Sequence, residues 1–128
     1  MKDVTAALMV RGNEIFIAKR KLGQHLESMW EFPGGKIEVD ETGEECLARE
    51  LEEEFGIGAI VRSFFMESIY HYERGAIRLL AYFVDDIVGT FVPTVHEEIK
   101  WVEISQLLNY DLAPADIPIA EALVAKYA

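Results

Sequence analysis

Three glutamates near the middle of the chain stand at a spacing that could serve metal chemistry. At about 100° per residue, Glu50, Glu53 and Glu54 point into one narrow sector of a helix. The neighbouring sector of the same projection is apolar and holds Leu47, Ala48, Leu51 and Phe55. Carboxylates beside a buried face lose hydration, and a hard divalent cation such as Mg2+ offsets that loss. The pattern favours a metal site, with a solvated acidic helix face as the alternative.

The acidity of the chain is concentrated in this region. Residues 36–54 hold nine acidic and two basic residues, and so carry −7 of the formal net charge of −11. Nucleic acid binding depends on basic side chains that neutralise phosphates, so we expect no nucleic acid polymer as a partner. A polyanionic small molecule could still bind where cations lie between it and the carboxylates.

The helix that carries the glutamates has recognisable ends. Thr42 followed by Glu45 forms a capping box, and Gly56 lies where a helix would stop, so we predict a helix between them. Arg49 is placed one turn after Glu45 and one turn before Glu53. We therefore expect its guanidinium to hold those two carboxylates in fixed rotamers.

The rest of the chain reads as strands joined by turns. Residues 4–10 and 15–20 flank Gly12-Asn13 and predict an opening hairpin, and Pro33-Gly34-Gly35 marks a turn. Further segments are predicted as strands at 59–72, 76–84 and 99–104, a helical turn at 105–108, and a last helix from about Asp116 to Tyr127. Strands mixed with two helices predict an α+β fold with a mixed sheet.

Length and composition limit the class of protein. A chain of 128 residues fits a single domain, 1–128, with one core. No apolar run approaches the roughly 20 residues of a membrane-spanning helix, so we expect no membrane partner. The N-terminus lacks the pattern of a secretory signal, and the single cysteine, Cys46, excludes an internal disulfide framework. These features predict a cytoplasmic location.

The glutamates belong to a longer pattern that resembles a known family. Gly35, five residues, Glu41, seven residues and then "RELEEEFGI" resemble the Nudix box, here residues 35–57. The segments "FIAKR", "WEFPGGKIE" and "LAPADIPI" extend the resemblance over nearly the whole chain. They are similar to MutT-type nucleotide pyrophosphohydrolases, most closely the branch that acts on CTP or modified pyrimidine triphosphates. The resemblance implies a Nudix fold, an α/β/α sandwich with a loop-helix-loop box.

By match to the motif, the box would bind Mg2+, for which Mn2+ can substitute. The implied ligands are Glu50, Glu53 and Glu54, with a main-chain carbonyl at Gly34 or Gly35. Glu53 is the first candidate to orient or deprotonate the attacking water, and Glu50 is the second, because groups in such a cluster titrate together. Arg49 is expected to support this catalytic set, and Glu41 to favour the positive end of the helix.

The outer metal ligand departs from the family pattern. MutT-type enzymes often carry a further glutamate six residues before the late-strand tryptophan, which is Trp101 here. That position is Val95, and either Glu97 or Glu98 is a candidate substitute. His96 is expected to be a loop or substrate-side residue rather than a ligand.

Two cations near the box resemble positions that contact phosphate. These are Arg20 and Lys36, and the forked donors of arginine suit a phosphate group. The alternative for Arg20 is an ordinary surface charge at the end of a strand.

The resemblance places the base-reading residue at Asp116, just before the last helix. An ionised carboxylate only accepts hydrogen bonds, and cytosine offers an amino donor, so cytosine is the preferred base. A protonated aspartate, or the N7–H of 8-oxoguanine, would permit the oxidised purine instead. The alternative role for Asp116 is a helix cap. Further ligand-side candidates are Phe32, Tyr70, Tyr72 and Arg78.

These features predict a Mg2+-dependent enzyme that hydrolyses a nucleoside triphosphate to a monophosphate and pyrophosphate. CTP, dCTP or a modified nucleotide is the expected substrate, with 8-oxo-dGTP as the alternative. Two further readings of the pattern are hydrolysis of a nucleoside diphosphate derivative such as ADP-ribose, and a non-catalytic nucleotide-sensing module. The expected oligomeric state is a monomer or a homodimer.

Overall fold

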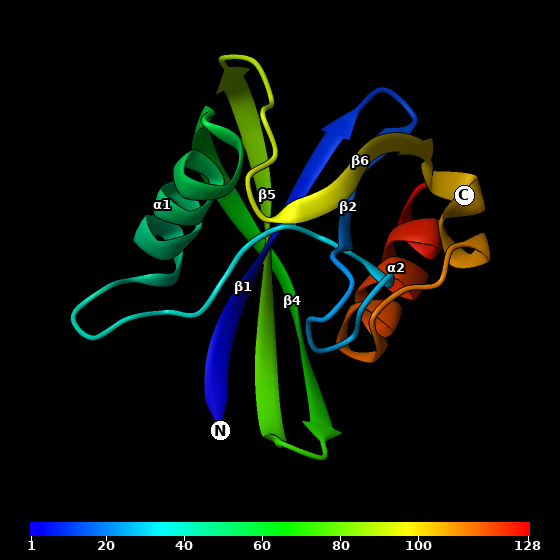
Figure 1. The fold of residues 1–128 in the computed structure, drawn as a ribbon. Coiled ribbons are helices and arrows are strands. Elements are labelled where there is room, and N and C mark those ends of the chain that lie inside the picture. Colours follow the sequence, from blue (N-terminus) through cyan, green and yellow to red (C-terminus); the bar gives the residue numbers. More distant parts are fainter.

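The computed structural model describes residues 1–128 and contains strands, two α-helices and two 3-10 helices (Figure 1). The elements in chain order are β1 (Lys2–Arg11), β2 (Glu14–Arg20), β3 (Trp30–Glu31), α1 (Gly43–Phe55), β4 (Gly58–Tyr72), β5 (Gly75–Val88), β6 (His96–Glu103), η1 (Ile104–Asn109), η2 (Pro114–Asp116) and α2 (Ile117–Lys126). No helix is both long and apolar enough to cross a membrane.

The sheet is organised around β1. Strand order is β3-β2-β1-β5-β4, and β6 pairs with β2 outside this path. β1 runs parallel to β5 from Lys2 to Met9, and antiparallel to β2 only at Val10 and Arg11. The predicted opening hairpin is therefore confirmed, but it is short, because residues 33–37 hydrogen-bond to β1 at Asp3, Thr5 and Ala7 on the edge that β2 would otherwise use. The sheet is mixed, as predicted.

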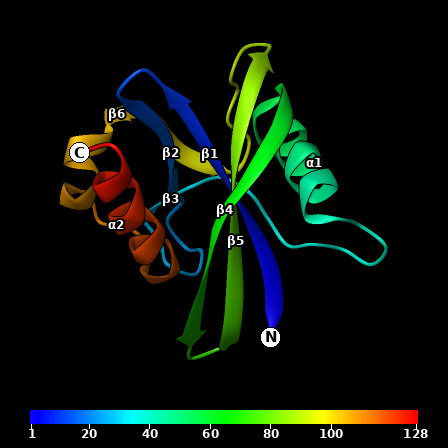
Figure 2. The same cartoon turned by 180° about the vertical axis from the view of Figure 1, so that it is seen from behind.

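Alternation along β1 divides the apolar residues into two cores. Ala7 and Met9 pack with α1, whereas Ala6 and Leu8 pack in the cluster that includes α2. Successive side chains of a strand point to opposite faces, so one strand can support both helices. Figures 1 and 2 show α1 and α2 on opposite sides of the strands. The α+β architecture with the sheet between helices is confirmed.

The predicted ends of α1 are confirmed by its caps. The Thr42 hydroxyl accepts from the Glu45 backbone N–H at 3.1 Å, and the Glu45 carboxylate accepts from the Thr42 N–H at 2.9 Å. Gly56 ends the helix with φ of 71°, a left-handed conformation that suits glycine. Because Glu45 is engaged at the cap, the prediction that Arg49 holds Glu45 is wrong.

The remaining elements lie close to their predicted places. Residues 105–108 fall within η1, and the last helix is preceded by the short turn η2. The segment with Pro33-Gly34-Gly35 runs antiparallel alongside β1, because the Ala7 N–H donates to the Pro33 carbonyl at 2.7 Å and the Thr5 N–H to the Gly35 carbonyl at 2.8 Å. This pairing brings the turn next to Glu50 of α1, where the predicted site lies.

Candidate metal and nucleotide site

The glycine turn is pressed between β1 and α1. A Cβ at Gly34 would lie 2.0 Å from the Thr5 carbonyl oxygen, and a Cβ at Gly35 would lie 2.3 Å from the Glu50 carboxyl carbon. Neither position has room for a side chain. The Gly35 carbonyl oxygen already accepts from the Thr5 N–H at 2.8 Å and the Thr5 hydroxyl at 3.1 Å. Of the two main-chain ligand candidates, Gly34 is therefore the better placed.

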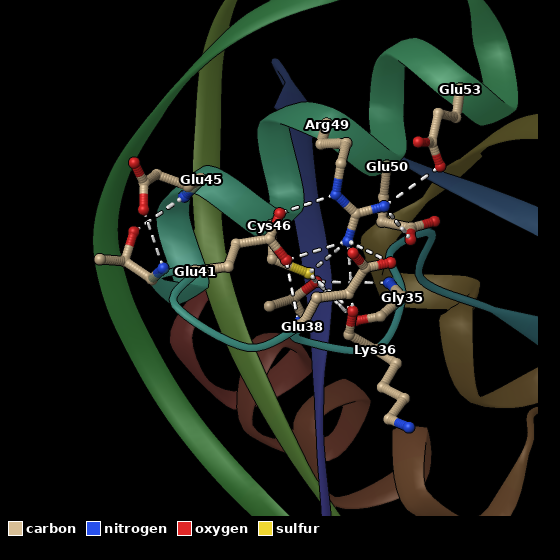
Figure 3. Close-up of polar contacts among 11 residues, drawn as sticks. Gly35, Lys36, Glu38, Glu41, Glu45, Cys46, Arg49, Glu50 and Glu53 are labelled. Carbon is tan, nitrogen blue, oxygen red and sulfur yellow. Dashed lines mark hydrogen bonds and ion pairs between the residues drawn. The ribbon is translucent and has the colours of Figure 1, made fainter.

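Arg49 gathers several carboxylates, as Figure 3 shows. Its Nε donates to Glu41 at 2.7 Å, and its Nη1 donates to Glu50 at 2.9 Å and to Glu53 at 3.2 Å. Hydrogen bonds from Arg49 lower the pKa of Glu41 to about 2, with the Glu38 backbone N–H adding to the effect. Glu41 thus anchors the arginine, rather than acting on the helix end as expected, and Arg49 sets the rotamers of Glu50 and Glu53.

Glu54 lacks any such partner. Its Oε1 is buried and makes no hydrogen bond. Burial raises the pKa of the Glu54 carboxyl to about 8, and the neighbouring Glu50 and Glu31 carboxylates add to the rise. Burial also raises the pKa of Glu50. An ionised Glu54 needs a positive partner that the protein itself does not fully provide.

A cavity of about 650 Å³ opens beside Glu54. Gly34 and Gly35 line the end near Glu54, and Phe32, Tyr72 and Asp116 also contribute to its wall. Basic side chains on the wall are those of Lys2, Arg20 and Arg74. The volume falls within the range of small-molecule sites, and the wall combines apolar residues with charged side chains of both signs.

Asp116 is buried, and its carboxylate faces the turn segment. Oδ2 accepts from the Phe32 backbone N–H at 2.9 Å, and the side chain makes no capping hydrogen bond to α2. The helix-cap alternative is therefore wrong. Burial raises the pKa of Asp116 well above its ordinary value, with Glu31 as a second cause. The Tyr72 hydroxyl accepts from the Ala115 N–H at 3.0 Å and so holds the neighbouring residue.

Several predicted site residues lie outside the cavity wall. Arg78 donates to Asp3 at 3.0 Å, and Glu97 pairs with Lys19 at 3.6 Å. Figure 3 shows the exposed Lys36 side chain directed away from the carboxylates. Glu53 is also on the surface, with 59% of its side chain exposed. Tyr70 and Glu98 are exposed as well and do not line the cavity.

Glu31 and His96, which both line the cavity, contact each other, and this contact was not foreseen from the sequence. Glu31 accepts from Arg20 Nη1 at 3.1 Å and contacts His96 Nε2 at 2.9 Å. Arg20 is thus held in the cavity wall and is not a free surface charge. The signal for Glu31 was a single acid in the apolar run "WEF", directly before the glycine turn.

The carboxylates near the cavity could bind a hard divalent cation, but some of them would first have to move. No group of three or more histidine, cysteine, aspartate or glutamate side chains is already arranged to hold a metal. Arg49 occupies Glu50 and Glu53, whereas the buried Glu54 oxygen has no partner. Mg2+ usually takes one or two carboxylates and completes its shell with water and substrate phosphates. Glu54 with Glu50 fits that requirement.

A sequence model of the NUDIX domain matches residues 1–123. The chain belongs to the NUDIX family. It is 38% identical over 125 residues to the CTP pyrophosphohydrolase of Escherichia coli (strain K12), covering 98% of this chain and 93% of that protein. It is 35% identical over 111 residues to the 8-oxo-dGTP diphosphatase of the same organism, covering 87% and 86%. NUDIX proteins generally use a divalent metal ion.

Solved structures agree with this assignment. The solution structure of the E. coli ORF135 protein superposes with a TM-score of 0.90 at 38% identity, covering 100% of this chain and 91% of that one. A second solved structure is described as MutT from the fish pathogen Aliivibrio salmonicida and from Vibrio cholerae. It superposes with a TM-score of 0.78 at 30% identity, covering 98% of each chain. The predicted family and Nudix fold are confirmed.

Replacing Glu54 should change how the free energy of unfolding of the metal-free protein depends on pH. The unfolded chain ionises this carboxyl near its ordinary pKa, and the folded protein ionises it near 8. Between those values the folded state holds the extra proton, so wild-type stability falls as pH rises. Glu54→Gln should therefore gain stability over wild type by about 2–4 kcal/mol between pH 5 and pH 9. Urea unfolding in EDTA measures this difference.

Glu52→Gln is the matched control, because Glu52 is exposed on the same helix. Its stability should follow the wild-type pH curve. Parallel curves for Glu54→Gln and wild type would show that the Glu54 carboxyl is not held in an unfavourable environment.

Proposed function

We propose that this NUDIX protein hydrolyses a nucleoside triphosphate to the monophosphate and pyrophosphate with the help of Mg2+. The observation that carries the proposal is the buried, unpartnered Glu54 oxygen at one end of a cavity whose wall also holds a buried carboxyl, that of Asp116. One end is suited to a cation and phosphates, and the other to a base. A bound cation would neutralise phosphate charge and lower the pKa of an attacking water.

The residues around Glu54 would have separate roles in binding the cation, activating the water and contacting phosphate. Glu50 and Glu54 would hold the cation, with the Gly34 carbonyl as a main-chain ligand. Glu53 would accept the proton of the water or orient it, and 59% of its side chain is exposed to solvent. Arg49 keeps Glu50 and Glu53 in place, and Arg20 on the cavity wall would contact phosphate.

We place the base beside Phe32, Tyr72 and Asp116. The ring of Phe32 or Tyr72 provides a surface for stacking, and the Asp116 carboxyl provides polar recognition. An ionised Asp116 accepts from the amino group of cytosine, so CTP or dCTP is the preferred substrate. The 38% identity with the E. coli CTP pyrophosphohydrolase supports this choice.

An 8-oxo-dGTP diphosphatase activity is the second candidate. The burial that raises the pKa of Asp116 favours its protonated form. A protonated carboxyl both donates and accepts, which suits the O6 and N7–H of 8-oxoguanine. The 35% identity with the E. coli 8-oxo-dGTP diphosphatase supports this candidate.

A substrate panel tests the proposed reaction. CTP, dCTP, 8-oxo-dGTP, ADP-ribose and diadenosine polyphosphates would each be incubated with the protein and Mg2+, and the products separated. We expect pyrophosphate and a monophosphate from a triphosphate, with dCTP or CTP hydrolysed fastest. Orthophosphate as the main product, or no turnover of any triphosphate, would contradict the proposal. Hydrolysis of ADP-ribose alone would assign the site to diphosphate derivatives.

The Asp116→Asn variant tests base recognition. An amide can still accept through oxygen but can also donate to a purine O6, so the ratio of kcat/KM for dCTP over 8-oxo-dGTP should fall. The expected size is roughly that of a good base-edge contact, about 1–3 kcal/mol or 5- to 150-fold. The Mg2+ dependence should not change, because Asp116 lies outside the carboxylate cluster.

Asp111→Asn is the matched control, because Asp111 is exposed and does not line the cavity. Its substrate ratio should equal that of wild type. An unchanged ratio in Asp116→Asn would mean that the wild-type carboxyl already acts as a donor and an acceptor, which favours the oxidised purine.

A further inference from the structure

His96 is a buried histidine with one ring nitrogen unaccounted for. It begins β6, only 6% of the residue is exposed, and its side chain lines the cavity. Its ring stacks on Phe55, with ring centroids 5.4 Å apart and planes at 9°. Stacking fixes the plane of the imidazole, so the two nitrogens have fixed directions.

The segment before His96 is bound to the last turn of α1. The Thr94 N–H donates to the Glu54 carbonyl at 2.9 Å, and the Thr94 hydroxyl donates to the Glu53 carbonyl at 3.1 Å. With the stacking on Phe55, these contacts hold His96 beside the turn that carries Glu54. Both side chains line the same cavity.

The hydrogen bond to Glu31 determines which nitrogen of His96 carries a proton. His96 Nε2 lies 2.9 Å from Glu31 Oε2, and an ionised carboxylate only accepts. Nε2 is therefore the N–H, and in the neutral imidazole Nδ1 carries a lone pair that can bind a cation. That Nδ1 is buried and has no partner, as has Glu54 Oε1. Two buried polar atoms at one site thus lack a hydrogen-bond partner, although buried polar groups are almost always satisfied.

We propose that His96 Nδ1 and Glu54 Oε1 bind one divalent cation together, and that the nitrogen ligand makes this position prefer Mn2+ or Co2+ to Mg2+. The proposal rests on the proposed function, whose cation it assigns a further ligand. A metal-binding histidine almost always gives its other N–H to a carboxylate, which is the role of Glu31 here. Imidazole suits transition metals, whereas Mg2+ favours oxygen ligands.

With His96 added to Glu50, Glu54 and the Gly34 carbonyl, the cation would have three side-chain ligands. These side chains would move closer together on binding, because no such group of three is already arranged in the metal-free protein. Water and substrate phosphate oxygens would complete the coordination shell. The expectation from the sequence that His96 is not a ligand is replaced by this proposal.

Electron spin-echo spectroscopy of bound Mn2+ tests the proposal without any substrate. Protein labelled with 15N only at histidine would be titrated with Mn2+, and a directly bound nitrogen would be sought. We expect the 15N coupling in wild type, its loss in His96→Gln, and its retention in His71→Gln. His71 is the matched control, because it is exposed on β4 and does not line the cavity.

Metal affinity provides the second measurement. Mn2+ binding should weaken at least about 10-fold in His96→Gln, and about 10- to 100-fold in Glu31→Gln, which keeps the ligand but loses its orienting carboxylate. Mg2+ affinity should change less in both variants, so the preference for Mn2+ should fall. If thermal unfolding shows that His96→Gln does not fold, the Glu31→Gln variant still tests the proposed nitrogen ligand.

Wild-type protein without a 15N coupling to bound Mn2+, or without Mn2+ binding, would overturn the proposal. Equal losses of Mn2+ and Mg2+ affinity in the two variants would also overturn it. Neither result bears on the pyrophosphohydrolase reaction, which is measured separately by pyrophosphate release from wild-type protein with Mg2+. The failure of the nitrogen ligand and the failure of the proposed function are thus distinguishable.

Discussion

The burial of the Glu54 carboxyl without a partner is the constraint on which the rest of the site depends. A carboxylate removed from water is stable only when it is protonated, paired or bound to a cation. The apolar face of α1 places Glu54 against the core, and Arg49 is committed to Glu41, Glu50 and Glu53. The protein therefore leaves Glu54 Oε1 without a hydrogen-bond partner, and only the Gly34 backbone and the charge of Arg20 favour the ionised carboxyl.

One short segment connects the two ends of the cavity. The Phe32 N–H fixes Asp116 at the proposed base end, and two residues later the glycine turn fits between Thr5 and Glu50 at the metal end. Glu31, just before this segment, orients Arg20 and His96. The same short segment therefore contacts both Asp116 and the α1 carboxylate Glu50. Thr5 and Glu50 leave no room for side chains at Gly34 and Gly35.

Local patterns in the sequence were sufficient for the helix that carries Glu50 and Glu54. The capping box at Thr42, the stop at Gly56 and the spacing of Glu50 and Glu54 are properties of neighbouring residues, and each was predicted correctly in place. The α+β class followed from the same kind of local evidence. The parallel pairing of β1 with β5 was not predictable in this way, because it joins residues more than 70 positions apart.

Contacts between distant segments account for the differences in the site. Arg78 was expected at the ligand, but Asp3 on the adjacent β1 takes its guanidinium. Glu31 and His96 were missed as a pair, since 65 residues separate them and neither has a local motif. The helix-cap alternative for Asp116 followed from its place before α2, yet its carboxylate accepts from the Phe32 N–H instead. Such partners become visible only after the sheet has assembled.

The release of protons on metal binding tests the central claim most directly. Because the pKa of Glu54 is about 8 in the metal-free protein, a cation that binds this carboxylate at pH 7 must displace a proton. Titration calorimetry of Mg2+ in buffers of different ionisation enthalpy should show release of about one proton per ion at pH 7 and little at pH 9.5. Glu54→Gln should release none. Binding without proton release, or an equal release from Glu54→Gln, would contradict the assignment of the cation to Glu54.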